Sequence, residues 1–543
     1  MLSKPLPNAD DTSVPAHADV DVLVVGGGIN GAGIARDLAG RGLRVLLCEK
    51  DDLAQHTSSC STKLIHGGLR YLEYYEFSLV RKSLAEREVL LKSAPHIMWP
   101  LRFVMPHDPG DKTLRPVWMI RLGLFLYDHL AKREVLPAST TVDLRRHPAG
   151  RALKPLFSKG YVYSDGWVDD ARLVVLNALD AVAHGAEVLT RWRCVDAQRS
   201  ATHWQVRLES THGEVREVRE LKARALVNAA GPWAAQFLAD HAHEPRPKSL
   251  RLVKGSHIVV PKMFDHEHAY IFQNPDKRII FAIPYEREFT LIGTTDVEHL
   301  GAVGEARISP DETAYLCEQA SRYFARPVTP AQVVWSYSGV RPLLDDESGG
   351  DASSVTRDYL LELDTEGAPL LNVWGGKITT FRKLAEEAAE LLAAPLAVTR
   401  GAWTRGASLP GGDLTSWIGP AQRPDTDFAR FAQALSLRHP ASPAALCHRL
   451  ARAYGARAEL VLGADHLGAE VAPGLFEAEL HYLHTHEWAR SADDVLWRRS
   501  KLGLHLTPAQ RTAVADWCAA HWPDAIAPVA TTATPRTTEG AWN

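Results

Sequence analysis

Residues 55–71 (QHTSSCSTKLIHGGLRY) combine residue types that together suit a phosphate-containing cofactor. The stretch starts with a run of hydroxyl side chains, continues with the basic Lys63, and then reaches the glycine pair Gly67-Gly68. Hydroxyl and ammonium groups donate hydrogen bonds to phosphate oxygens and to the oxygens of a ribityl chain. Such a density of donors favours an extended, tightly held flavin over a mobile nicotinamide. The alternative interpretation is an ordinary loop rich in Ser and Thr.

An element typical of nucleotide binding comes before this stretch. An apolar segment, residues 21–25 (DVLVV), predicts a strand and leads directly into residues 26–31 (GGGING), which match G-x-G-x-x-G. The next residues, 32–39, predict a helix, and residues 44–48 predict a second strand that ends at Glu49. Strand, glycines, helix, strand and acid in this order predict binding of an adenine dinucleotide. The motif alone does not separate FAD from NAD.

Each residue of this motif has a defined physical task. Gly26 permits the tight turn after the strand, and Gly28 lets the backbone approach a pyrophosphate at the start of the helix. Gly31 allows the helix to pack closely against the strand. The carboxylate of Glu49 is placed to accept hydrogen bonds from ribose hydroxyls, and its charge would repel a 2′-phosphate.

Two distant segments repeat the plan of a strand, a turn of small residues and a helix. They are residues 225–233 (ALVNAAGPW), with a helix expected near Trp233, and residues 371–380 (LNVWGGKITT). A helix N-terminus within residues 375–380 would place partial positive charge and Lys377 near a flavin pyrimidine ring, where reduction builds up negative charge. Each segment alone is also compatible with plain α/β scaffold.

These segments and several others resemble one family, the aerobic FAD-dependent glycerol-3-phosphate dehydrogenases of the D-amino-acid-oxidase-like flavoprotein group. The matching motifs are residues 25–33 (VGGGINGAG), 63–72 (KLIHGGLRYL), 254–260 (KGSHIVV), 293–296 (GTTD), 337–343 (YSGVRPL) and 375–380 (GGKITT). They run in order from about residue 21 to residue 412, and residues 487–503 resemble the family's helical C-terminal domain. Cys60, Thr62 and Ala230 depart from the frequent residues of the family without affecting a catalytic role.

The resemblance implies oxidation of sn-glycerol 3-phosphate to dihydroxyacetone phosphate, with the C2 hydride passing to flavin N5. His66 is the first candidate for the base, since an unperturbed histidine accepts a proton near neutral pH, and His257 is the second. The guanidinium groups of Arg70 and Arg341 suit the phosphate, with Tyr71 and Lys377 as further substrate contacts. The expected cofactor contacts are Gly26, Gly28, Asn30, Gly31, Glu49, Thr57, Ser58, Ser59, Ser61, Lys63, Gly67, Gly68, Gly231, Gly376, Lys377 and Thr379.

Composition excludes several classes of protein. Of 543 residues, 61 are Lys or Arg and 65 are Asp or Glu, so the formal charge of −4 gives no net attraction to nucleic acid, and 45% apolar residues exclude a wholly disordered chain. The six cysteines are never closer than twelve positions, which favours a reducing compartment over a disulfide framework or a zinc site. The histidines around residues 481–487 lack the HExxH order, so no metal is expected.

The expected electron acceptor decides whether the protein must reach a membrane. Within the resembling group, dehydrogenases pass electrons to a membrane quinone and sister enzymes use oxygen. No secretory signal is recognisable in residues 1–18, and the apolar residues 117–130 are interrupted by Arg121 and Asp128, so a spanning helix is not expected. This segment suits either a lipid interface or a buried helix. A cytoplasmic protein held at the cytoplasmic face of the membrane is expected, and a homodimer is left open.

The expected architecture is α/β. A Rossmann-like FAD-binding domain (residues 19–73, 161–250 and 335–394) is interleaved with a sheet-containing substrate domain (residues 74–160 and 251–334). A helical C-terminal domain (residues 395–523) follows, and residues 1–18 and 524–543 are expected to be loose tails. Two alternatives to a quinone-linked dehydrogenase remain, an oxygen-reducing glycerol-3-phosphate oxidase and a non-catalytic flavin-binding sensor. The sensor would need neither His66 nor Arg341.

Overall fold

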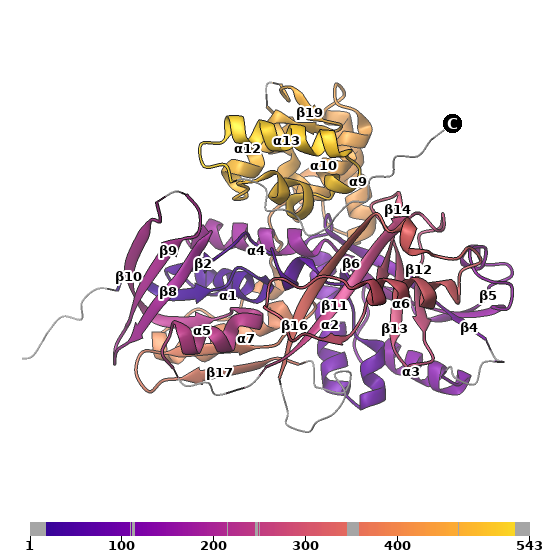
Figure 1. Cartoon of the computed structure of the whole chain (residues 1–543), viewed down its shortest axis with the longest axis horizontal. Coiled ribbons are helices and arrows are strands. Elements are labelled where there is room, and N and C mark those ends of the chain that lie inside the picture. Colours follow the sequence, from indigo (N-terminus) through magenta and orange to yellow (C-terminus); the bar gives the residue numbers. More distant parts are fainter. Residues whose placement is uncertain are drawn as a thin grey trace, which may run out of the picture.

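The computed structural model describes residues 18–526, except for 109, 111–114, 214, 245–247, 249, 345–357 and 465. Residues 1–17 and 527–543, which make up most of the two expected tails, lie outside the described part. Two sheets lie side by side, and a group of helices from the C-terminal part of the chain covers the junction between them (Figure 1). This arrangement agrees with the expected α/β class and the helical C-terminal domain.

The first sheet carries the nucleotide-binding motif. Its main path runs β17 (Leu360–Asp364), β18 (Leu370–Trp374), β10 (Val218–Asn228), β1 (Val20–Val25), β2 (Val45–Glu49) and β7 (Glu187–Thr190), with β8 (Trp192–Arg199) and β9 (Trp204–Ser210) attached through β10. The pairs β18–β10, β10–β1, β1–β2 and β2–β7 are parallel, whereas β17 and β9 pair antiparallel to their neighbours. The carboxyl ends of β1, β10 and β18 therefore meet at one edge.

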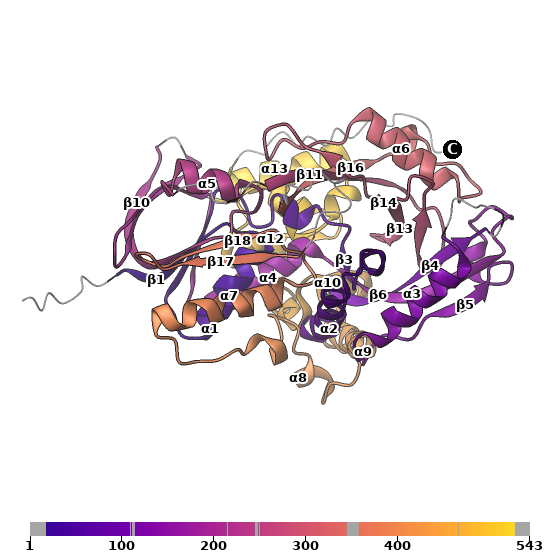
Figure 2. The same ribbon diagram turned by 90° about the horizontal axis from the view of Figure 1, so that it is seen from below.

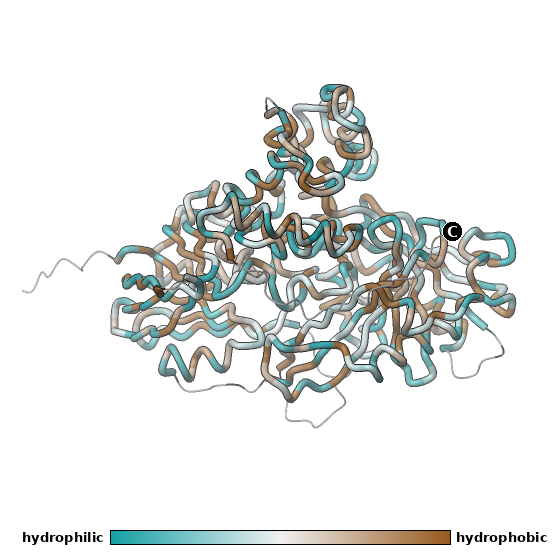
Figure 3. Tube along the Cα trace, turned by 45° about the horizontal axis from the view of Figure 1, so that its top comes forward, coloured by the Kyte–Doolittle hydropathy of each residue, from teal (hydrophilic) through white to brown (hydrophobic). Residues whose placement is uncertain are grey.

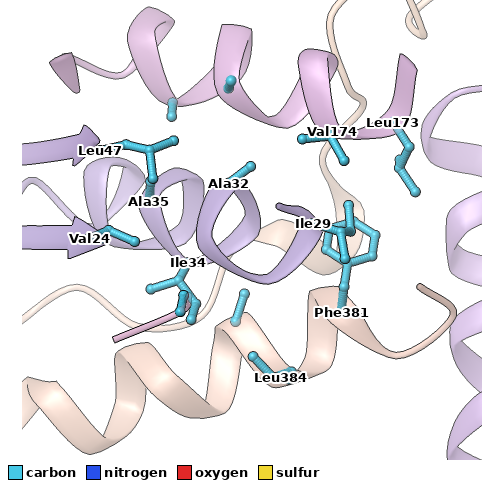
Figure 4. Packing of buried hydrophobic residues seen from close by; sticks show 14 of the residues in the cluster. Val24, Ile29, Ala32, Ile34, Ala35, Leu47, Leu173, Val174, Phe381 and Leu384 are labelled. Carbon is cyan, nitrogen blue, oxygen red and sulfur yellow. The ribbon is translucent and has the colours of Figure 1, made fainter. Parts of the chain in front are cut away.

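Three helices cover one face of this sheet, with α1 (Ile29–Gly40) packed between α4 (Asp170–Ala183) and α7 (Phe381–Leu396) (Figure 4). Small residues allow the close approach. Ala32 and Ala35 are fully buried, and a Cβ added to Gly33 would lie 2.8 Å from the Phe381 ring. Helix α5 (Ala234–Asp240) begins one residue after Trp233, as the sequence predicts.

The second sheet is mixed. Its path runs β15 (Val297–Glu298), β11 (Leu250–Pro261), β14 (Phe289–Gly293), β13 (Ile279–Tyr285), β12 (Ala269–Gln273), β4 (Met98–His107), β6 (Lys159–Val168) and β3 (Leu64–Ile65), with β16 (Trp335–Leu344) on β11 and β5 (Thr140–Asp143) on β6. Helix α6 (Pro310–Ser321) packs on one face, and α2 (Phe77–Ser93) and α3 (Val117–His129) pack on the other. Figure 2 shows α3 beside β4 and β6.

Strand pairing assigns three segments differently from the boundaries expected from sequence. Those boundaries place residues 64–65, 161–168 and 335–344 in the FAD-binding domain. In the structure, β3 pairs with β6, β6 pairs with β4 along its whole length, and β16 pairs with β11, all in the second sheet. The difference has a physical cause. A strand's apolar pattern shows that it is buried, whereas its sheet is decided by hydrogen-bond partners far away in the sequence.

The C-terminal helices have a core of their own. They are α8 (Thr415–Ile418), α9 (Pro424–Arg438), α10 (Ala444–Tyr454), α11 (Glu459–Leu462), α12 (Glu477–His486) and α13 (Pro508–His521), with a short hairpin of β19 (Glu470–Ala472) and β20 (Leu475–Phe476). Phe431, Leu435 and Leu483 are fully buried in this core. Figure 3 shows that apolar segments lie inside the molecule and that many outer loops are hydrophilic. No helix among the described residues is both long enough and apolar enough to span a membrane.

Candidate active site

A cavity of about 780 Å³ lies where the carboxyl ends of β1, β10 and β18 face the second sheet. Its wall is built from segments that are far apart in the sequence: residues 25–30, 229–233 and 375–379 come from the three strand ends, and His257 and Arg341 come from β11 and β16. Parallel strands bring their carboxyl ends to one edge, which is where α/β proteins bind nucleotides. The sheet topology thus gathers the separate sequence motifs at one site.

The glycine turn at this edge leaves no room for side chains. Gly26 has φ of +112°, and a Cβ added there would lie 2.5 Å from the carbonyl oxygen of Ala229. A Cβ on Gly31 would lie 1.9 Å from the carbonyl oxygen of Gly26, so Gly31 supports the turn from behind instead of lining the cavity. Backbone at this turn is therefore open to a ligand, as dinucleotide binding requires.

Two polar side chains at the turn are oriented for a ligand. Burial raises the pKa of Glu49, whose Oε2 accepts a hydrogen bond of 2.6 Å from the N–H of Gly27. Asn30 Nδ2 donates to the carbonyl oxygen of Gly375 at 3.1 Å, while its buried Oδ1 has no hydrogen-bond partner among the described residues. Both side chains line the cavity. An unsatisfied buried oxygen beside an open backbone turn indicates that a polar ligand completes the site.

Some residues of the hydroxyl-rich stretch at 55–63 line the cavity, and others lie behind its wall. Thr57, Ser58 and Ser61 line the cavity, and Ser58 Oγ accepts a hydrogen bond of 3.0 Å from the N–H of Ile29 at the start of α1. Lys63, also expected to contact the cofactor, is 1% exposed and forms an ion pair of 2.7 Å with Asp170 on α4. It also donates to the carbonyl oxygen of Ser59 at 3.0 Å. The structure places Lys63 and Ser59 behind the cavity wall.

Residues 375–380 form a turn and not the start of a helix. Helix α7 begins at Phe381, and Gly375 and Gly376 have φ of +70° and +107°. In the turn, Lys377 Nζ lies 3.9 Å from the centre of the Tyr71 ring, a cation–π distance. The expected helix N-terminus is therefore displaced from this segment, but Lys377 lines the cavity as predicted.

His66 lies at the cavity and is held through its backbone. Its N–H donates to Thr379 Oγ1 at 3.2 Å, so two of the predicted site residues contact each other across 313 positions. The next N–H, that of Gly67, donates to Tyr127 Oη at 2.7 Å and to Asp165 Oδ1 at 3.3 Å. Gly67 is buried behind the wall, as is Gly68, and neither lines the cavity. These contacts fix the turn that carries the histidine.

His257 and Arg341 lie on the opposite wall. His257 is 2% exposed, stacks on Tyr337 with ring centres 4.8 Å apart, and has its Nε2 3.0 Å from Thr62 Oγ1. Burial, together with the positive charges of Lys63 and Arg341, lowers the pKa of His257 well below its usual value. A neutral, weakly basic His257 suits a hydrogen-bonding role better than that of a base.

Arg341 is held by a carboxylate beside the cavity. Its Nη2 lies 2.7 Å from Asp296 Oδ1 and donates to the carbonyl oxygen of Thr295 at 3.0 Å. Arg70, the other predicted clamp, lies outside the cavity lining and donates to Tyr74 Oη at 3.1 Å. The structure therefore brings Arg341, Lys377, Tyr71 and His66 together but leaves Arg70 at the edge.

Sequence reasoning missed the group that supports His66. Tyr127 Oη donates to Asp165 at 2.7 Å, and Arg87 Nη1 donates to Asp165 Oδ1 at 2.6 Å, all three side chains being buried. Burial raises the pKa of Asp165, although the charge of Arg87 opposes that effect. A tyrosine at the inner face of an apolar helix carries no sequence signal for this role.

Replacing Tyr127 with Phe is expected to lower kcat about 10-fold, because the Gly67 N–H loses its main acceptor and the His66 turn loosens. The KM for substrate and the FAD content are expected to change less than twofold. Tyr161→Phe is the matched control, since the Tyr161 hydroxyl is also buried in this part of the protein and has no hydrogen-bond partner among the described residues. Equal kcat values for the two variants would contradict the positioning role of Tyr127.

Comparison with known families shows the family to which the chain belongs. Residues 21–382 match the model of the FAD dependent oxidoreductase family, and residues 402–521 match the C-terminal domain of alpha-glycerophosphate oxidase. The chain belongs to the FAD-dependent oxidoreductases. The glycine turn, Glu49 and the unsatisfied Asn30 oxygen lie at one cavity, so the residues of this oxidoreductase fit FAD.

Relatives match this oxidoreductase over nearly its whole length. Glycerol-3-phosphate dehydrogenase of Pseudomonas aeruginosa is 51% identical over 95% of this chain and 98% of its own, and aerobic glycerol-3-phosphate dehydrogenase of Escherichia coli is 50% identical over 92% and 97%. D-erythritol 1-phosphate dehydrogenase of Brucella abortus is also 50% identical, over 92% and 97%. The structure of glycerol-3-phosphate dehydrogenase from Bacillus halodurans, complexed with FAD, superimposes with a TM-score of 0.73 at 28% identity, covering 92% of this chain and 90% of its own. The resemblance seen in the sequence motifs is confirmed.

Proposed function

We propose that this oxidoreductase oxidises sn-glycerol 3-phosphate to dihydroxyacetone phosphate in glycerol catabolism. The observation that carries the proposal is the meeting of His66, Arg341 and Lys377 at the cavity that the glycine turn also lines. Two cations suit a dianionic phosphate, and a histidine suits a hydroxyl that must lose its proton. Relatives with the same named activity are about half identical to the chain.

In the proposed reaction the C2 alcohol loses one proton and one hydride and becomes a ketone. His66 takes the hydroxyl proton. Thr379 accepts from its N–H and Tyr127 accepts from the N–H of Gly67, and these two contacts hold the turn in place. Arg341, oriented by Asp296, and Lys377 bind the phosphate and hold C2 at a constant position. When bound, FAD supplies the two-electron acceptor for the hydride.

Anaerobic mixing tests the proposal. Addition of sn-glycerol 3-phosphate to the holoenzyme is expected to bleach the visible absorbance of the flavin, and the 1-phosphate of D-erythritol is the comparison, since one relative is named for it. Bleaching by the erythritol phosphate alone would assign the chain to that second substrate. No bleaching by either compound would favour a non-catalytic flavin-binding protein.

We further propose that a membrane quinone reoxidises the enzyme, which binds as a peripheral protein to the cytoplasmic face of the membrane. Helix α3 supports this proposal because its outer side is apolar: Trp118 is 65% exposed, Phe125 57% and Leu122 51%. Lys132 is 84% exposed just beyond the helix. Aromatic residues beside cations are typical of a surface that lies on anionic lipid headgroups.

The variant Trp118→Ser/Phe125→Ser is expected to bind vesicles of phosphatidylethanolamine and phosphatidylglycerol at least 10-fold more weakly than wild type, because each large apolar side chain contributes about 1.5–3 kcal/mol on burial. Cosedimentation with the vesicles measures the binding. Leu437→Ser/Leu460→Ser is the control, because these exposed leucines lie on the C-terminal helices, away from α3 (Figure 1). Equal binding by both variants would exclude α3 as the membrane contact.

The acceptor is tested with the reduced enzyme. Rapid reoxidation by a short-chain quinone, with little hydrogen peroxide formed in air, is the expected result. Stoichiometric peroxide in air would instead identify an oxygen-reducing oxidase.

A further inference from the structure

The C-terminal domain reaches the FAD-binding domain through a buried carboxylate, that of Asp52. Arg498 Nε and Arg499 Nη1 each donate to Asp52 Oδ2 at 2.6 Å, and Arg499 Nη2 donates to Oδ1 at 2.7 Å. Asp52 is 1% exposed and Arg499 is fully buried. Burial alone would raise the pKa of Asp52, but the arginines hold it well below its usual range. Asp52 is therefore a carboxylate held by two residues more than 440 positions away.

Both arginines are themselves fixed within their own domain. Arg499 Nε and Nη2 donate to the carbonyl oxygen of Glu487 at 3.0 and 2.6 Å, and Arg498 forms an ion pair with Asp494. Asp494 also pairs with Arg191 at 2.7 Å. Both guanidinium groups are thus held by contacts within their own domain as well as by Asp52.

Asp52 belongs to the segment that forms one wall of the FAD cavity. Residues 49–51 and 54–58 line the cavity, whereas Asp52 and the fully buried Leu53 turn away from it. Inside the segment, the Asp52 N–H donates to Gln55 Oε1 at 3.1 Å, and Ala54 has φ of +59°. The wall therefore has a bent backbone whose outer side is anchored at Asp52.

We propose that the C-terminal domain is a positioning element for FAD, in which Arg498 and Arg499 hold Asp52 and thereby fix the cavity wall formed by residues 49–58. The carboxylate of Glu49 stands three residues before Asp52 in this wall. Its Oε1 accepts from the Asp51 N–H at 2.8 Å, so a shift of the Asp52 anchor passes directly to Glu49. Retention of FAD by this wall does not depend on which substrate the enzyme oxidises.

A second ion pair, between the half-buried Arg449 and the buried Glu479, provides a control. Arg449 Nη1 donates to Glu479 Oε1 at 2.8 Å, and Glu479 is 1% exposed. Both residues lie in the C-terminal domain, and neither lines the FAD cavity. Loss of this pair is expected to lower the stability of the domain without releasing Asp52, which separates a positioning role from a merely structural one.

The test compares FAD release from the holoenzyme, followed by the rise in flavin fluorescence on dilution, in Arg499→Met, Arg499→Lys and Arg449→Met. FAD release is expected to be about 10-fold faster in Arg499→Met and to be slowed again in Arg499→Lys, which keeps the charge, while Arg449→Met remains within twofold of wild type. Hydrogen exchange of residues 49–58 is expected to accelerate in Arg499→Met alone.

Two results would overturn the proposal. The first is FAD release from Arg499→Met that is no faster than from Arg449→Met. The second is faster release without faster hydrogen exchange in residues 49–58, because the wall would then be unaffected by loss of its anchor. If Arg499→Met does not fold, Arg498→Met removes the other C-terminal donor to Asp52 and takes its place in both comparisons.

Discussion

Replacement of His66 by Asn is expected to lower the rate of flavin reduction by sn-glycerol 3-phosphate about 10²–10⁴-fold, the usual contribution of a positioned general base. Asn keeps a polar group of similar size at the cavity but does not accept a proton near neutral pH. Substrate binding is expected to change by less than about threefold, because the phosphate contacts of Arg341 and Lys377 remain. Stopped-flow absorbance at several substrate concentrations separates the rate from the binding constant.

The same measurement on His257→Asn decides between the two histidines. The pKa of His257 lies well below the usual value, so this ring is neutral and weakly basic at pH 7. If His257 acts only as a neutral hydrogen-bonding group, His257→Asn is expected to lower the rate of flavin reduction by at most about 10-fold. A larger loss in His257→Asn than in His66→Asn would reverse the assignment. An unchanged rate in His66→Asn would remove that residue as the base.

The pH dependence of the stability of the folded protein provides an independent check on the environment of His257. A histidine whose pKa is lowered by folding binds fewer protons in the native state than in the unfolded state below about pH 6.5. The free energy of unfolding is therefore not reduced by this histidine above that pH, and it falls as the pH drops from about 6.5 towards the folded pKa. The protein is expected to lose stability on acidification below pH 6.5, and His257→Asn is expected to reduce that loss.

Short sequence motifs predicted the parts of the site that are formed by residues close together in the sequence. The turn at Gly26, the acid at Glu49 and the positions of His66 and Lys377 at the cavity all follow from motifs of a few residues. In contrast, Lys63 was predicted to contact the cofactor because it follows a run of hydroxyls. Its actual partner, Asp170, lies 107 positions away on another element, and no local pattern shows that pairing.

The contacts of Asp52 were also missed, because its partners lie even farther away in the sequence. Arg499 is separated from Asp52 by 447 positions, and each residue alone is indistinguishable from a solvated surface charge in the sequence. The membership of β6 and β16 in the second sheet was missed for a related reason. Alternating apolar residues predict that a strand is buried but not which strand it pairs with. Contacts between domains therefore required the three-dimensional structure.

Gly31→Ala is expected to weaken FAD binding at least about 100-fold and to destabilise the protein by about 1–3 kcal/mol, the usual cost of an overpacked buried site. The added Cβ would lie 1.9 Å from the carbonyl oxygen of Gly26, which is backbone and has no rotamer to move into. The turn at Gly26 must therefore open, and the approach to the pyrophosphate is lost.

Titration of the FAD-free protein with FAD measures the first effect, and urea unfolding without FAD measures the second. Gly401→Ala is the matched control, because a Cβ there meets no atom within 4 Å. If Gly31→Ala bound FAD as tightly as Gly401→Ala, close packing of α1 against the turn would not be what forms the pyrophosphate site. If Gly31→Ala lost FAD affinity but kept its stability in urea, the glycine would serve the ligand alone. Loss of both, with an unaffected control, would show that one backbone contact supports both the fold and the cofactor.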